Sequence, residues 1–307
     1  MKKIQSELIN EIINKNLTES DEEFVPSKFQ KYFDQITRES FEINNNKQSD
    51  YYKKDLGTYE LLGIPNPLEL SKVQIKKITS IFAEILKSLI GTVSKKDRVL
   101  VVGLGNRHIS ADSLGTKVIK NINITLGDYN YPKVMAICPS VLGLTGIETY
   151  DIIKGVIEKT NPSHIIFIDS LCASSVSRLA CSIQLSNTGI CPGSGIGNNR
   201  KCLDKTLAKK VYSIGVPLLI YANTFVDTNF ENFGIDIPRI NSIMQSAKKS
   251  ENNSKFIDLL MDLKNCLNSS MENIIVSIKD IEECVEILSK IIANAINQTL
   301  GVAELNQ

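Results

Sequence analysis

Residues 98–106 read Arg-Val-Leu-Val-Val-Gly-Leu-Gly-Asn, an almost continuous apolar run that closes in glycines. Such a run is typical of a strand that is buried on both faces, as strands are in a parallel sheet covered by helices. The stretches at 133–138 (KVMAIC) and 164–169 (HIIFID) repeat this type, and a further strand is expected at 211–221 (VYSIGVPLLIY). The chain therefore contains several strands of a buried sheet.

Helical patterns alternate with these strands. Apolar residues recur at helical spacing over 70–89, 147–159 and 281–300, and the last of these is expected to close the fold by packing on the sheet. Strands that alternate with helices indicate an α/β fold with a largely parallel central sheet flanked by helices. In such a sheet the ligand site lies at the carboxyl ends of the strands.

Composition narrows the class of protein. The 307 residues are 42% hydrophobic and 22% charged, which is typical of a soluble globular protein. The 35 Lys and Arg residues nearly balance 34 Asp and Glu residues, so direct nucleic-acid binding is not expected. No stretch has the length and apolar character of a signal peptide or a membrane span, so we expect a cytoplasmic protein without membrane contact.

The number and spacing of the histidines and cysteines argue against a metal site and a disulfide framework. The chain has only two histidines, so no metal site and no cofactor is expected, although carboxylate ligation of a metal stays open. Its seven cysteines are odd in number and form no CxxC pair, which favours reduced thiols over a disulfide framework. Cys172 is interpreted as a small buried hydrophobe rather than a nucleophile.

The chain is expected to form one main domain. Residues 1–52 are polar and Asn-rich, which predicts a weakly packed N-terminal arm. Residues 53–307 then form a single α/β domain, with a divergent, weakly patterned insertion around 225–270.

Two carboxylates stand out by position. Asp169 ends the apolar run at 164–169, and Asp112 follows the strand that ends at Gly103. If these strands are neighbours, both acids lie at one edge of the sheet, where they could share a proton and act as general base and general acid. The alternative is that both are loop or cap residues, since a helix begins after Asp112 and Asp is a good N-cap.

Other polar residues border the same edge. Gly103-Leu-Gly-Asn106 lacks the third glycine of a dinucleotide motif and carries His108 there, so a tight strand-to-loop turn is favoured. Glu148 opens the helix at 147–159 and either lines the cleft or acts only as a first-turn acid. The glycine-rich stretch 189–201 adds a flexible loop. Its candidate cleft-lining residues are Gly193, Ser194, Gly195 and Arg200.

Five stretches, in this order and spacing, resemble the germination protease family of spore-forming bacteria. They are VVGLGN at 101–106, ADSLG at 111–115, GLTGIETYDIIKGVIEK at 143–159, FIDSL at 167–171 and NTGICPGSGIGNNRK at 187–201.

The resemblance implies an endopeptidase that degrades small acid-soluble spore proteins at germination. It also implies an atypical aspartic mechanism, a phosphorylase/hydrolase-like fold shared with hydrogenase-maturation proteases, and homotetramers made as zymogens in the forespore or spore core. The catalytic pair of the family falls on Asp112 and Asp169. Part of residues 1–52 would then be a propeptide, although the family's R-T-D-L-A-x-E processing segment is not found in this sequence.

Some positions depart from the family pattern. Asn187 stands for an aspartate, Cys191 for a histidine, Ser174 for an arginine and Ser140 for a glycine. These departures leave open a non-catalytic or altered-specificity paralogue that binds spore proteins without cutting them. The Val-Gly-Leu-Gly-Asn strand end also leaves open a peptidyl-tRNA hydrolase-like enzyme, although no histidine precedes His108.

Overall fold

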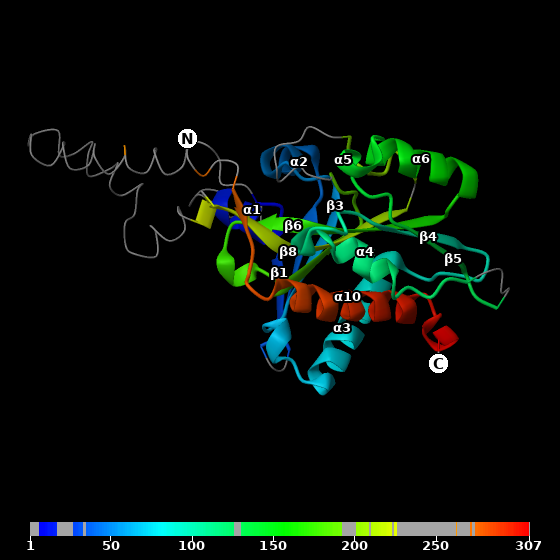
Figure 1. Ribbon diagram of the computed structural model, residues 1–307, viewed down its shortest axis with the longest axis horizontal. Helices are drawn as coiled ribbons and strands as arrows, with labels where there is room; N and C mark the ends of the chain where they lie inside the picture. The colour runs from blue at the N-terminus through cyan, green and yellow to red at the C-terminus, as the bar shows by residue number, and fades with distance from the viewer. Residues whose placement is uncertain are drawn as a thin grey trace, which may run out of the picture.

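The computed structural model describes residues 6–16, 27–32, 35–125, 130–191, 201–208, 210–222, 224–225, 262, 271 and 274–306. Within these residues one sheet of nine strands runs through the molecule, with helices on both faces (Figure 1). The strand order is β1-β2-β3-β7-β8-β6-β4-β5, and β9 pairs with β8.

One half of the sheet is parallel, as predicted. It consists of β5 (Lys133–Ile137), β4 (Arg98–Gly103), β6 (His164–Ala173) and β8 (Val211–Tyr221), in that spatial order. The apolar runs of β4, β6 and β8 are buried on both faces, which explains why the sequence pattern is continuous rather than alternating, whereas β5 at the edge of the sheet is only partly buried. β6 continues four residues beyond the expected end at Asp169.

The other half is antiparallel, so the predicted parallel strands form one side of a mixed sheet. Its strands are β1 (Ser27–Lys31), β2 (Thr37–Ile43), β3 (Gly57–Gly63), β7 (Ser182–Ser186) and the short β9 (Ile275–Val276). In β1, β2, β3 and β7 polar residues interrupt the apolar ones, so none of them has a long apolar run. The pairing of β3 with β7 also joins distant parts of the chain, which no local pattern can indicate.

Three helices cover one face of the sheet: α3 (Lys72–Ile90), α4 (Leu114–Ile119) and α10 (Ile281–Thr299). α3 begins with a capping box between Ser71 and Gln74, and α3 and α10 pack on each other below the sheet (Figure 1). The helical spacing at 70–89 and 281–300 therefore predicted the main core of the protein.

The opposite face is covered by α6 (Thr149–Thr160) and α1 (Ile9–Asn16), with α2 (Asn46–Tyr52) and α5 (Leu142–Thr145) nearby. Short 3-10 turns complete the fold: η2 (Pro67–Glu69), η3 (Ser110–Asp112), η4 (Val176–Arg178) and η6 (Ala303–Asn306). None of the helices in the described ranges combines the length and the apolar character needed to cross a membrane.

The N-terminal residues are more ordered than the sequence indicated. Leu8, Ile9 and Ile13 are at most 2% exposed, and β2 is hydrogen-bonded to β3 along its length. The expectation of a weakly packed arm is therefore wrong for the described part of 1–52, because a short apolar stripe there packs on the sheet. Most of the expected insertion at 225–270 lies outside the described residues.

Candidate active site

Asp169 lies within β6, one residue past the last pair that β6 makes with β4, and is in register with Gly215 of β8. Its side chain is buried, and its Oδ1 atom accepts the backbone N–H of Ser170 at 2.9 Å. The backbone N–H of Leu104 donates to the carbonyl of Ile168 at 2.8 Å, which carries the pairing of β4 and β6 one residue past β4. The loop after β4 therefore begins beside Asp169.

Asp112 lies in that loop, in the turn η3. Its Oδ2 atom accepts the backbone N–H of Asn106 at 2.8 Å, and Asn106 Oδ1 in turn accepts the backbone N–H of His108 at 3.0 Å. The N-cap of α4 is Ser113 rather than Asp112. The aspartate thus braces the start of its own loop, and the alternative interpretation as a helix cap is wrong.

The glycines of the β4 end shape this loop. Gly105 has φ +100°, and a Cβ atom there would lie 2.1 Å from the backbone oxygen of Asp112. A Cβ on Gly103 would lie 2.3 Å from the carbonyl oxygen of Gly115. The Gly-Leu-Gly motif is therefore a tight strand-to-loop turn, as interpreted from the sequence, and it allows η3 to approach the sheet.

The turn that carries Asp112 lies against the strand that carries Asp169. β4 and β6 are neighbours, which is the condition for the two strand ends to meet, and η3 contacts both β6 and β8. Burial, and then the negative charges of Glu7, Asp169 and Asp112, raise the pKa of the Cys172 thiol. Both carboxylates thus act on one buried group, and Cys172, at 3% exposed, is unsuited to be a nucleophile.

The remaining predicted site residues have different surroundings. His108 is exposed, and Glu148 is the exposed N-cap residue of α6, without a side-chain capping bond. α6 follows β5 along the chain, so its first turn lies at the edge formed by the carboxyl ends of the parallel strands. At that edge it lies on the side of β5, not on the side of β6. The predicted residues Gly193, Ser194, Gly195 and Arg200 lie outside the described residues.

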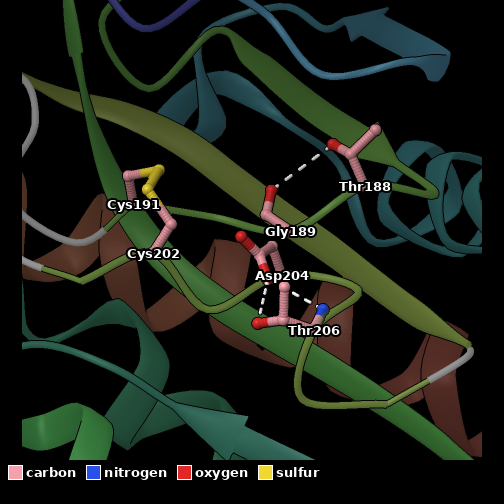
Figure 2. The surroundings of a disulfide bond; sticks show 6 residues. All are labelled: Thr188, Gly189, Cys191, Cys202, Asp204 and Thr206. Atoms are coloured by element: carbon pink, nitrogen blue, oxygen red, sulfur yellow. Dashed lines mark hydrogen bonds between the residues drawn. A yellow bond between two sulfur atoms is a disulfide. The ribbon is translucent and has the colours of Figure 1, made fainter.

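A disulfide joins Cys191 to Cys202, so the expectation of reduced thiols alone is wrong (Figure 2). Ile190 and Leu203, the residues next to the two cysteines, exchange backbone hydrogen bonds of 2.9 and 2.8 Å. Spacing along the sequence did not reveal this pair, because the cross-strand pairing that brings the two cysteines together is set by the buried position of Leu203.

Two positions in the Asn-Thr-Gly stretch have structural roles. Asn187 Oδ1 accepts the backbone N–H of Thr58 at 2.9 Å, which joins the end of β7 to the start of β3. Gly189 is required because a Cβ there would lie 2.1 Å from the carbonyl oxygen of Leu203. The stretch therefore holds the scaffold together and lies outside the acid/base chemistry.

The N-terminal segment 6–13 is surrounded by residues that the sequence patterns did not single out. Glu7 Oε2 accepts the backbone N–H of Cys172 at 2.8 Å, and Glu11 accepts the backbone N–H groups of Ser174 and Ser175 at 2.6 and 3.1 Å. The segment thus lies against the end of β6, just beyond Asp169. The amphipathic spacing of Leu8, Ile9 and Ile13 was the available signal.

Among the described residues, no group of three or more His, Cys, Asp and Glu side chains is arranged to hold a metal ion. Two carboxylates at one sheet edge are suited to acid/base chemistry, because closely placed acids favour a state in which one is protonated and the other ionised. Such a pair can activate water on one side of a bond and protonate a leaving group on the other.

Comparisons with known proteins identify the relatives of this chain. The sequence model of the germination protease family matches residues 5–255. The germination protease of Clostridium acetobutylicum is 34% identical over 303 residues, covering 90% of each chain. That of Bacillus subtilis is 39% identical over 216 residues, covering 65% of this chain and 56% of its own length.

Among solved structures, the NiFe hydrogenase maturation protease HycI from Thermococcus kodakarensis KOD1 is similar to 44% of this chain and 80% of its own, with 17% identity and a TM-score of 0.32. The matches to the germination proteases extend over most of the chain. The chain belongs to the germination protease family.

Proposed function

We propose that this protein is an endopeptidase that hydrolyses small acid-soluble spore proteins at germination, with Asp112 and Asp169 as its catalytic pair. The observation that carries the proposal is that β4 and β6 are parallel neighbours, with Asp112 in the turn η3 after β4 and Asp169 in β6 just past the last paired residue, and that η3 contacts β6. Membership of the germination protease family supports the protease activity and its place in spores.

The reaction needs one aspartate ionised and the other protonated. The ionised carboxylate removes a proton from water as the water oxygen attacks the peptide carbonyl, and the protonated carboxyl donates its proton to the departing amine. Either residue can take either part, since the pair shares one proton. The backbone N–H groups of Asn106 and Ser170, which donate to the two carboxylates, hold them in place for this exchange.

A non-catalytic paralogue that binds spore proteins is the second candidate, since four positions depart from the family pattern. Two of these positions have local structural explanations: Asn187 bonds Thr58, and Cys191 forms the disulfide. By the resemblance, the catalytic pair of the family falls on Asp112 and Asp169, so we favour the active enzyme. The family membership leaves the peptidyl-tRNA hydrolase-like alternative without support.

The proposal includes the expectations drawn from the family resemblance. The enzyme would act in the forespore or spore core, be made as a zymogen, and assemble as a homotetramer. Light scattering of the purified protein measures the assembly directly, and a monomer at working concentration would contradict that part.

The decisive test is cleavage of a purified small acid-soluble spore protein, followed by mass spectrometry of the fragments. Asp112→Asn and Asp169→Asn should each retain the fold and lower kcat by roughly 10²- to 10⁴-fold, as the loss of a general acid or base does. Asp151→Asn, at an exposed acid in the first turn of α6, is the matched control and should cleave normally. Full activity in Asp169→Asn would end the proposal.

A further inference from the structure

The N-terminal segment 6–13 lies over a row of residues that includes Asp169. Gly215 of β8 is in register with Asp169 of β6 on one side and with Gln184 of β7 on the other. Residues in register on adjacent strands point to the same face of a sheet, so Gln184 and Asp169 flank Gly215 on one face. The side chain of Leu171 fills the space above Gly215, where a Cβ would lie 2.4 Å from its Cδ1 atom.

The Gln184 side chain binds the backbone of the segment at two points. Its Oε1 atom accepts the backbone N–H of Ile9 at 2.7 Å, and its Nε2 atom donates to the carbonyl oxygen of Glu7 at 3.4 Å. On the β6 side, the backbone N–H of Glu7 donates to the carbonyl of Cys172 at 3.0 Å. A stretch of peptide backbone is thus held between β6 and β7, beside the candidate aspartates.

A lysine binds the same carbonyl group. The Nζ atom of Lys54, just after α2, donates to the Glu7 carbonyl oxygen at 3.0 Å. Burial lowers the pKa of Lys54, against the opposing attraction of Glu7 and Asp55. A partly desolvated ammonium and a carboxamide therefore converge on one peptide carbonyl, which is the arrangement that stabilises negative charge on oxygen during acyl transfer.

Both contacts are made to backbone atoms, so they would serve any peptide in this position. The side chains of Leu8 and Ile9 pack into the apolar cluster with Leu61 and Leu171, which aligns the backbone with the Gln184 carboxamide. Residues 6–8, which precede α1, therefore show how this face of the sheet binds a short non-helical stretch of peptide backbone.

We propose that Lys54 and Gln184 are the carbonyl-binding residues of the active site, and that residues 6–8, the non-helical stretch before α1, occupy the position that a substrate peptide takes. This inference rests on the proposed function. When water adds to the carbonyl carbon, the oxygen takes the negative charge and receives the hydrogen bonds of Lys54 and Gln184. The C–N bond then breaks, the amine takes the proton of the protonated aspartate, and the products are a carboxylic acid and an amine.

The experiment compares cleavage with docking of the N-terminal segment. Lys54→Met and Gln184→Leu keep the size of each side chain and remove its donors. We expect kcat for a small acid-soluble spore protein to fall by roughly 10²- to 10³-fold in Lys54→Met, as for the loss of one oxyanion donor. Hydrogen exchange with mass spectrometry should show lost protection in residues 6–13 of both variants. Lys53→Met, at the exposed neighbouring lysine, should change neither measurement.

The two measurements separate a catalytic role from a structural one. If protection is lost while kcat stays at the wild-type value, the two residues only hold the N-terminal segment, and the assignment is wrong. A change confined to KM also overturns the assignment, because a competing segment alters binding rather than the chemical step. If Lys54→Met does not fold, Gln184→Leu decides by the same criteria.

If the wild-type protein does not cleave a small acid-soluble spore protein, the proposed function is wrong. The assignment of Lys54 and Gln184 to catalysis is then wrong as well, whatever the hydrogen-exchange data show. A wild-type protein that cleaves, with unaffected Lys54→Met and Gln184→Leu variants, would overturn only the inference about these two residues.

Discussion

Gly105 and Asp112 are in direct backbone contact: a Cβ atom on Gly105 would lie 2.1 Å from the carbonyl oxygen of Asp112 and 2.9 Å from its Oδ1 atom. The glycine also has φ +100°, which side-chain-bearing residues rarely adopt. The position of a candidate catalytic acid therefore depends on a residue seven positions earlier that carries no functional group.

Gly105→Ala should displace Asp112 and lower both stability and cleavage. Backbone strain of this kind costs about 1–3 kcal/mol, and the shift of the carboxylate should reduce kcat more than KM. Thermal unfolding and cleavage kinetics measure the two effects. Gly143→Ala is the matched control, because a Cβ at Gly143 meets nothing within 4 Å. Normal activity in Gly105→Ala would show that the loop does not set the position of Asp112.

Ser140→Gly should stabilise the protein. Ser140 has φ 67°, and its buried hydroxyl has no hydrogen-bond partner among the described residues. Relief of the left-handed strain, about 1–2 kcal/mol, exceeds the entropic cost of glycine, about 0.5–1 kcal/mol. The melting temperature should rise by roughly 2 °C. Ser80→Gly, within the regular helix α3, should lower it, and a fall in both variants would contradict the explanation.

Stability should fall as the pH drops below about 6.5, partly because of His164. This histidine is fully buried, and desolvation and then the charge of Lys210 lower its pKa, against the attraction of Asp97. The unfolded chain therefore binds a proton at a higher pH than the folded protein does. The contribution of His164 to stability is fully present at pH values above the ordinary histidine pKa. Below that pKa, the free energy of unfolding falls by up to about 1.4 kcal/mol per pH unit.

Denaturant unfolding at pH 7.5 and 5.5 measures this effect. His164→Gln should reduce the difference between the two pH values, whatever its effect on absolute stability. His108→Gln, at the exposed histidine, should leave the difference unchanged. An unaltered pH dependence in His164→Gln would assign the effect to other groups.

Reduction of the Cys191–Cys202 disulfide should lower stability by about 2–3 kcal/mol, as expected for a crosslink that closes a loop of roughly this length. Cys202→Ser should lower the melting temperature without reductant and abolish its response to dithiothreitol. Cys138→Ser, at an exposed free thiol, should behave as the wild type. Labelling of Cys191 by an alkylating reagent in the unreduced protein would contradict the bond.

Elements with strong local patterns were predictable. The continuous apolar runs of β4, β6 and β8 and the helical spacing of α3 and α10 reflect burial against neighbours that are present whatever the order of strands. The same runs selected Asp112 and Asp169 as candidates, because parallel neighbouring strands end at one edge of a sheet.

The remaining features depend on contacts between distant residues. Gln184 meets the Glu7 carbonyl from 177 positions away, and Lys54 reaches it from 47 positions away. The sequence of β7 carries no distinctive pattern. Its role depends on its pairing with β3 and on its register with Gly215 of β8.

Thus the chain's own pattern of apolar runs and glycines determined the α/β core, since burial and backbone geometry act locally, and the acids near the strand ends provided the two candidate aspartates. The antiparallel half of the sheet, the docking of residues 6–13 and the pairing of Cys191 with Cys202 were decided by tertiary packing. Hydrogen bonds and crosslinks between remote segments leave no periodic trace in a sequence, because their partners become neighbours only after folding.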